Sequence, residues 1–145
     1  MADLTLRPAA EDDSSPIKDL IHRVGINPMD LDWHRFVVAV DQSGRMLGCG
    51  QLKPHGRDVV ELASIAVEPQ YRHQGVARLI IEHLVARAPR PLYLTCRSRL
   101  EAFYEQWGFR SLEPSEMPPY FRRLSRLAKV MGALMNDRLL VMKLM

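Results

Sequence analysis

The run from Val59 to Ala88 constrains the fold more than any other part of the chain, because its hydrophobic period changes in the middle. The residues VVELASIAV are almost continuously apolar, which predicts an interior strand over 59–67. After a polar turn, apolar residues recur at helical spacing from Gly75 to about Ala88, where Pro89 and Pro91 prevent continuation. A buried strand that leads through a polar loop into an amphipathic helix indicates a domain in which helices pack on a sheet.

The other elements follow from the same periodicities. Strands are predicted at 3–8, 36–40, 46–53, 92–96 and 139–144, with turns at 41–44 and 54–58. A first helix is predicted from about Glu11 to Val24, and a second begins with Ser98 as its N-cap and ends at Gly108. The order of strands and helices is mixed, so we expect an α+β fold.

Length and composition bound the class of protein. The chain has 145 residues, of which 47% are hydrophobic, and we expect a single domain over 1–145. The N-terminus does not resemble a secretory signal, and no apolar stretch is long enough for a membrane span, so we expect a cytoplasmic protein that does not act at a membrane. A net charge of +3 suits an anionic ligand at least as well as nucleic acid.

The cysteines point to neither a disulfide nor a metal. Cys49 and Cys96 lie far apart without a metal-ligand spacing, and we expect two small buried side chains and no metal site. Cys96 ends a predicted strand and could offer a nucleophile for covalent catalysis, but a buried side chain is the favoured interpretation.

The loop between the central strand and its helix is the strongest candidate site. Unpaired N–H groups at a helix N-terminus bind phosphate oxygens, and a Gly lets a phosphate approach the main chain. Gly75 supplies that opening, and Arg72 adds a charged donor. Taken alone, Gly75 can equally serve only a tight turn. The loop has neither the Gly-Lys-Ser/Thr of a Walker loop nor the three glycines of a dinucleotide fingerprint.

The string SIAVEPQYRHQGVARLII resembles the GNAT acetyltransferase signature R/Q-x-x-G-x-G/A, with Arg72, Gly75 and Ala77 at the marked positions. The resemblance implies the GNAT acyl-CoA N-acyltransferase fold, with a mixed central sheet of about six to seven strands flanked by helices. It implies acetyl-CoA as the acyl donor, with its pyrophosphate against this loop. The residues that it assigns to acetyl-CoA binding are Ile65, Ala66, Val67, Arg72, His73, Gln74, Gly75, Val76, Ala77 and Arg78.

A second match lies downstream. LEAFYEQWGF resembles the GNAT motif in which a helix carries a Tyr and closes on Gly-Phe, and the resemblance makes Tyr104 a candidate general acid for the departing thiolate of CoA. The alternative is that Tyr104 only packs beside Phe103 and Trp107. Where many members carry an Asn before this helix, the chain has CRSR, which puts that cofactor contact in doubt.

Glu61 interrupts the apolar central strand at the position where some GNAT members carry a catalytic Glu. A carboxylate there is costly unless it is solvated or paired, so we expect it to face a cleft and to accept a proton from the acceptor amine, directly or through water. An ion pair with a cation of a neighbouring strand is an equal alternative. The remaining histidines, His55 among them, have no partner at a telling spacing.

The segment from about 117 to 137 is a family-variable insertion, since the resemblance covers about 3–109 and the final strand. We expect it to shape the acceptor site or a subunit contact such as that of a homodimer, because Met117, Tyr120, Phe121 and Leu124 need a surface to cover. Its basic stretch 122–135 could instead bind nucleic acid or a membrane surface, but a packed helix with a solvated face is favoured.

These expectations combine into one function. The chain is expected to transfer acetyl from acetyl-CoA to a primary amine of a small molecule or amino acid in a ternary complex. Similarity of ELASIAV and LYLTCRS to amino-acid N-acetyltransferases favours an amino acid as acceptor. The alternatives are a catalytically silent acyl-CoA-binding module and a protein or peptide N-acetyltransferase.

Overall fold

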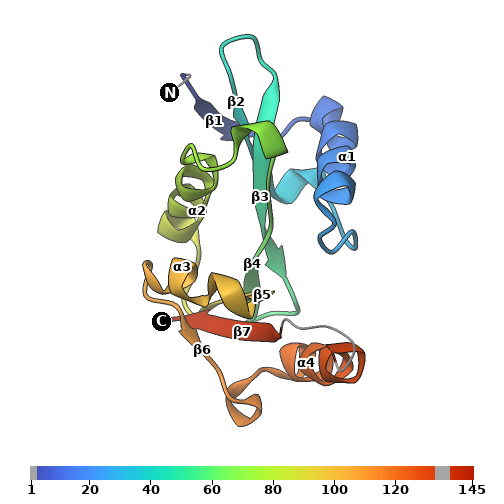
Figure 1. Ribbon diagram of the computed structural model, residues 1–145, viewed down its shortest axis with the longest axis vertical. Helices are drawn as coiled ribbons and strands as arrows, with labels where there is room; N and C mark the ends of the chain where they lie inside the picture. The colour runs from blue at the N-terminus through green and yellow to red at the C-terminus, as the bar shows by residue number, and fades with distance from the viewer. Residues whose placement is uncertain (1–2, 133–137) are drawn as a thin grey trace. The chain divides into compact units, whose positions relative to one another are not determined.

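A computed structural model describes residues 3–132 and 138–145 of the chain. Its strands form one sheet in the order β1-β2-β3-β4-β5-β7-β6 (Figure 1). The β4–β5 pairing is parallel, whereas the β1–β2, β2–β3, β5–β7 and β6–β7 pairings are antiparallel. This mixed sheet with helices confirms the predicted α+β fold class. The strand bounds are β1 Thr5–Pro8, β2 Phe36–Val40, β3 Met46–Pro54, β4 Val60–Val67, β5 Leu92–Arg97, β6 Arg110–Ser111 and β7 Leu139–Leu144.

The helices alternate with these strands. The α-helices are α1 Ser14–Val24, α2 Val76–Arg87, α3 Glu101–Glu105 and α4 Pro119–Gly132. Short 3-10 turns lie at η1 Glu11–Asp13, η2 Trp33–Arg35, η3 Pro69–Tyr71, η4 Ser98–Leu100 and η5 Pro114–Glu116. None of the helices within 3–132 and 138–145 has the length and apolar character needed to cross a membrane.

The chain divides into two compact units, Met1–Lys53 with Leu62–Ala88 and Pro54–Glu61 with Pro89–Met145. The division falls inside β4, so this one strand supplies residues to both units.

In the first unit, α1 and α2 lie on opposite sides of β2 and β3 (Figure 1). α1 buries Ile17, Leu20 and Ile21 against alternate residues of β2, among them Phe36 and Val38. On the other face, α2 approaches β3 closely at Gly50, where an added Cβ would lie 2.8 Å from Ile80 Cγ2. A residue larger than Gly has no room at this point.

In the second unit, α4 covers the sheet formed by β5, β7 and β6. Phe121 is fully buried and packs with Tyr93, Leu112, Met117 and Val141. The surface that the segment 117–137 was predicted to need is therefore the sheet of its own unit. Residues 133–137 of that prediction lie outside the described part of the chain.

One local prediction is wrong. Ser98 does not cap a helix; it begins the 3-10 turn η4, whose N-cap is Arg97, and its N–H donates to Arg138 O at 2.8 Å. α3 starts only at Glu101 and has no side-chain cap. The chain reaches the helix from β5 through a tighter turn than the sequence pattern indicated.

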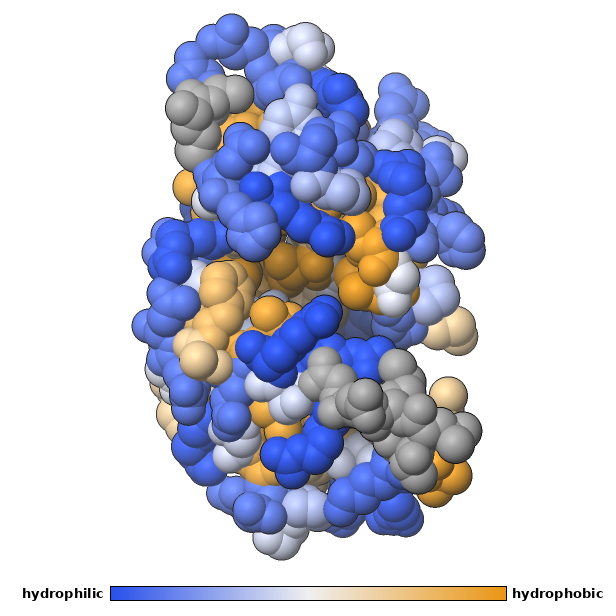
Figure 2. Space-filling view, in the orientation of Figure 1, coloured by the Kyte–Doolittle hydropathy of each residue, from blue (hydrophilic) through white to orange (hydrophobic). Residues whose placement is uncertain are grey.

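Hydrophilic residues make up most of the face drawn in Figure 2, with hydrophobic residues gathered in smaller areas. The last turns of α4 expose the apolar side chains of Leu127, Val130 and Met131.

Candidate functional site

The loop between β4 and α2 is held firmly by the first unit. Glu68 N–H donates to Leu47 O at 2.8 Å, and the Glu68 carboxylate pairs with Arg23 of α1. Beyond it, the guanidinium of Arg45 lies 5.8 Å from the centre of the Tyr71 ring. These contacts fix the entry to the loop, so its backbone direction is set before a ligand binds.

The N-terminus of α2 has the geometry of an anion site. Gly75 is the N-cap in a left-handed conformation with φ of 86°, and the first helical bond runs from Leu79 N–H to Gly75 O. The N–H groups of Val76 and Ala77 come before that bond and point out of the helix end. An added Cβ at Gly75 would meet nothing within 4 Å. The residues present therefore fit a pyrophosphate, because open space adjoins unpaired donors at the positive end of the helix dipole.

The exposed part of the loop adds side chains around this opening. Arg72, His73 and Gln74 are all exposed, and His73 has a φ of 65°. The Gln74 amide donates to Gln70 O at 3.4 Å, so it is turned toward its own loop. Arg72 is thus the exposed permanent cation at the start of the loop.

β4 has an irregular backbone just before this loop. Ser64 has a φ of 59°, a conformation that is unusual for a residue with a side chain. Its hydroxyl accepts from Gln51 Nε2 at 2.9 Å, and its carbonyl accepts from Cys49 Sγ at 3.6 Å. The positive φ changes the direction of the strand just before Ile65, Ala66 and Val67. The resemblance in sequence assigned these three residues to acetyl-CoA binding.

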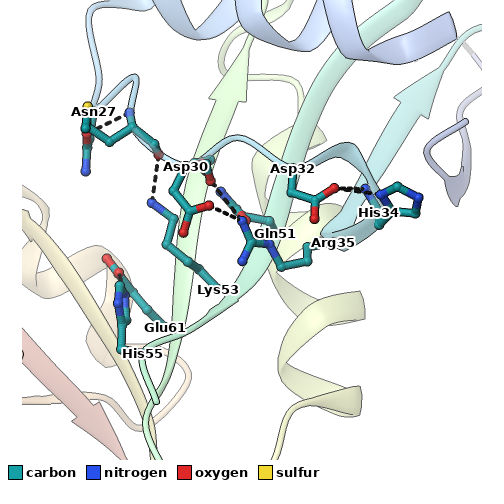
Figure 3. A network of polar contacts seen from close by, with 11 residues as sticks. Asn27, Asp30, Asp32, His34, Arg35, Gln51, Lys53, His55 and Glu61 are labelled. Carbon is teal, nitrogen blue, oxygen red and sulfur yellow. Dashed lines mark hydrogen bonds and ion pairs between the residues drawn. The ribbon is translucent and has the colours of Figure 1, made fainter. Parts of the chain in front are cut away.

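Gln51, Lys53 and Arg35 form a polar network in the first unit (Figure 3). The Lys53 ammonium is buried and donates to Met29 O at 3.1 Å, and Arg35 pairs with Asp30 at 2.6 Å. Gln51 is fully buried, and its Oε1 has no hydrogen-bond partner among the described residues. The sequence pattern singled out none of these groups.

Glu61 lies in the second unit and is 7% exposed. Its Oε1 is 2.7 Å from Nε2 of His55, which sits in the turn between β3 and β4 (Figure 3). The His55 ring stacks on Tyr120 of α4, with the two ring centres 3.8 Å apart. The expectation that His55 has no telling partner is wrong, because the hairpin turn brings residues six apart into contact. The partner of Glu61 is thus a turn residue, and not the cation of a neighbouring strand that the alternative interpretation named.

Tyr104 lies on α3 of the second unit and is 9% exposed. Burial raises the pKa of its hydroxyl, and the nearby Cys96 thiol adds to that rise. The ring packs edge-on against Phe103 at 5.1 Å and Phe109 at 6.2 Å. Its hydroxyl makes no hydrogen bond to any residue that the structure describes, and the hydroxyl oxygen is not fully enclosed by the protein. The packing expected of Tyr104 is therefore present, and the hydroxyl still has a proton to donate.

The two cysteines are buried side chains, as predicted. Burial raises the pKa of the Cys49 thiol to about 12, which keeps it protonated at neutral pH. Cys96 is 7% exposed, with its sulfur 3.8 Å from Met142 Sδ. Across the described ranges, no three His, Cys, Asp or Glu residues are grouped so as to hold a metal ion.

The predicted site residues thus fall into two groups. The acetyl-CoA residues Ile65–Val67 and Arg72–Arg78 lie together in the first unit, while Glu61 and Tyr104 belong to the second. Sequence reasoning singled out both groups but missed His55. The signal that could have found it is that His55 lies in the predicted turn 54–58, after which Glu61 follows.

Comparison with known proteins assigns the segment that contains these residues to a family. The family model for the acetyltransferase (GNAT) domain matches residues 32–111, a range that contains β4, the loop and Tyr104. A search of curated proteins finds no match.

Solved structures share the fold. N-acetylglutamate synthase from Neisseria gonorrhoeae, crystallised with coenzyme A and L-arginine, has a TM-score of 0.74 at 21% identity, over 97% of this chain and 33% of that one. This chain therefore spans about a third of that synthase. The Rv2747 protein from Mycobacterium tuberculosis, in complex with CoA and NLQ, has a TM-score of 0.73 at 21% identity, over 97% and 99%.

A third structure is the ribosomal-protein-S18-alanine N-acetyltransferase from Escherichia coli, with a TM-score of 0.69 at 20% identity over 98% of this chain and 93% of that one. These three likenesses concern the fold alone. The match to the family model covers more than half of the chain, so the protein belongs to the GNAT acetyltransferase family.

Proposed function

We propose that this protein transfers the acetyl group of acetyl-CoA to a primary amine of a small molecule or amino acid, by direct attack in a ternary complex. The observation that carries the proposal is the open N-terminus of α2 at Gly75, inside the segment that matches the GNAT family model. We place the protein in the cytoplasm, where acetyl-CoA and free amino acids are both present.

The first unit holds the donor. The N–H groups around Gly75 to Ala77 donate hydrogen bonds to the pyrophosphate oxygens, and Arg72 adds a charge-assisted contact. Ile65, Ala66 and Val67 flank the acyl arm, and His73, Gln74, Val76 and Arg78 complete the loop. Bound acetyl-CoA supplies the activated thioester.

Glu61 and Tyr104 supply the proton transfers. Glu61 accepts a proton from the ammonium form of the acceptor, which frees the nitrogen lone pair to form the new C–N bond. The C–S bond breaks, Tyr104 gives its proton to the sulfur, and the second proton that the nitrogen loses on becoming an amide restores the Tyr104 hydroxyl. The raised pKa of Tyr104 keeps that hydroxyl protonated at neutral pH, so it acts as a hydrogen-bond donor to the leaving group.

The class of acceptor is proposed from the names of structural relatives. Two relatives in fold carry names that refer to amino acids, an N-acetylglutamate synthase and a protein-alanine N-acetyltransferase. A screen of amino acids, polyamines, aminoglycosides and peptides, with release of the CoA thiol as readout, tests the proposal. We expect turnover with at least one free amino acid. Tight acetyl-CoA binding without thiol release for any amine would favour a silent acyl-CoA-binding module, and turnover only with peptides would favour a protein N-acetyltransferase.

The role of Glu61 has its own test. Glu61→Gln should lower turnover more at low pH than at high pH, because a base matters most when little free amine is present. An equal loss at every pH would assign Glu61 a structural role.

A further inference from the structure

Glu61 is held by a second titratable side chain. Nε2 of His55 lies 2.7 Å from Glu61 Oε1, and both side chains are nearly enclosed, at 12% and 9% exposed. A buried carboxylate that accepts a ring N–H keeps its charge more easily than an unpaired one. The contact also restricts Glu61 to one orientation.

The His55 ring is itself fixed from the other side. Tyr120 of α4 stacks on it at 3.8 Å with an interplanar angle of 19°, and Phe121 meets its edge at 5.7 Å. Phe121 is fully buried in the core of the second unit. A chain of contacts therefore runs from that core through α4 and His55 to the Glu61 carboxylate.

The same protein contains a matched pair in a different environment. His34 lies 2.7 Å from Asp32 and stacks on Trp33 at 3.7 Å, but its side chain is 68% exposed (Figure 3). Each pair joins a His ring nitrogen to a carboxylate oxygen, through Nδ1 in His34 and Nε2 in His55, and the two pairs differ strongly in burial. Ion pairs in solvent contribute little, whereas an enclosed pair fixes the geometry of its members.

We propose that His55 is a positioning residue of the acetyl transfer: its ring holds the Glu61 carboxylate in the orientation needed to take the proton of the acceptor, and Tyr120 of α4 keeps the ring in place. This rests on the proposed function. It gives the family-variable helix α4 a defined part in the reaction through one stacked ring.

Other ionisable groups on the neighbouring elements must be considered in any pH experiment. Tyr93 of β5 is the register partner of Glu61, and the ammonium of Lys143 on β7 lies 5.9 Å from the centre of the Tyr93 ring. Arg57 and Asp58 share the turn with His55, and both are exposed. None of these is altered in the variants below.

The test compares His55→Phe, which keeps a stacking ring but has no donor, with His55→Gln, which keeps a donor. We expect His55→Phe to lower kcat/KM for the acceptor by roughly ten- to a hundredfold, because the Glu61 carboxylate is then no longer held in one orientation. His55→Gln should restore part of the rate, and Tyr120→Leu should give a smaller loss. The control His34→Phe should match wild type.

Two outcomes would overturn the proposal: wild-type kinetics in His55→Phe, or a loss that His55→Gln does not relieve. A readout without turnover separates this result from failure of the proposed function. In an NMR spectrum of the intact protein, the His55 ring N–H should exchange slowly and should vanish in Glu61→Leu, which has no acceptor oxygen. If no amine is acetylated, that signal still decides whether His55 holds the carboxylate, and its absence from wild type would refute the pairing.

Discussion

The hydroxyl of Tyr104 belongs to a ring that is almost wholly buried, and this burial raises its pKa. We expect Tyr104→Phe to lower kcat by about two to four orders of magnitude, because the variant cannot share a proton with the leaving thiolate. Acetyl-CoA affinity should stay within a few-fold, since the hydroxyl is needed only when the C–S bond breaks. Steady-state kinetics and calorimetry measure the two quantities.

A buried tyrosine outside the proposed mechanism provides the control. Tyr93 is 6% exposed, so Tyr93→Phe also removes a hydroxyl from an enclosed ring. Both variants should keep the melting temperature close to wild type, because the rings and their aromatic contacts remain. Equal effects of the two changes on kcat would remove Tyr104 from the chemistry.

At the scale of elements, substitutions of two glycines test whether the pyrophosphate binds at the junction of α2 with its loop. Gly75 and Gly44 have φ of 86° and 85°, and an added Cβ at either would meet nothing within 4 Å. Valine should strain both backbones alike, but only Gly75→Val places a side chain where the phosphates approach. We expect calorimetry to show that acetyl-CoA affinity is lost in Gly75→Val and retained in Gly44→Val. Equal affinities in two folded variants would show that the pyrophosphate binds elsewhere.

The start of α1 should make stability depend on pH. Asp13 accepts from Arg7 at 2.7 Å and from Ala10 N–H at 2.7 Å, and the Arg7 contact is the main reason that its pKa lies below the usual range. A lowered folded-state pKa stabilises the protein above the unfolded-state value of about 3.9, and this contribution is lost as pH falls through the folded-state value.

Asp13→Asn should therefore lower the free energy of unfolding by roughly 1 kcal/mol at pH 7, a modest amount because Arg7 is partly exposed. The difference from wild type should shrink when urea unfolding is repeated near pH 3. Asp12→Asn, at the exposed neighbouring position, should have little effect at either pH. A deficit for Asp13→Asn that is the same at both pH values would contradict the assignment.

At the scale of the whole molecule, the strand pattern was largely predictable. The apolar runs gave β2 at 36–40 and β7 at 139–144 with the observed bounds, because each is a compact run of largely apolar residues. Ser98 shows why ends of elements are harder: its N–H is taken by Arg138 O, from a segment 40 residues away in sequence. The His55–Glu61 contact has the same character, since it depends on how a turn folds rather than on spacing along a strand.

The single domain expected from length remains a prediction, and the chain offers a direct test. The first unit is discontinuous in sequence, and β4 passes from one unit to the other within a single strand. Unfolding of either unit disrupts part of that strand, so we expect one cooperative unfolding transition. The two tryptophans report on the units separately, because Trp33 lies in the first and Trp107 in the second.

Single-tryptophan variants, Trp33→Phe and Trp107→Phe, should give coincident urea curves by fluorescence. Adding Phe121→Ala opens a cavity in the second unit and should cost about 3–5 kcal/mol of unfolding free energy. If the chain is one cooperative domain, the Trp33 signal must shift by the same amount as the Trp107 signal, although Phe121 lies outside the unit that Trp33 reports. A shift confined to the Trp107 signal would instead show two separately unfolding units joined at β4.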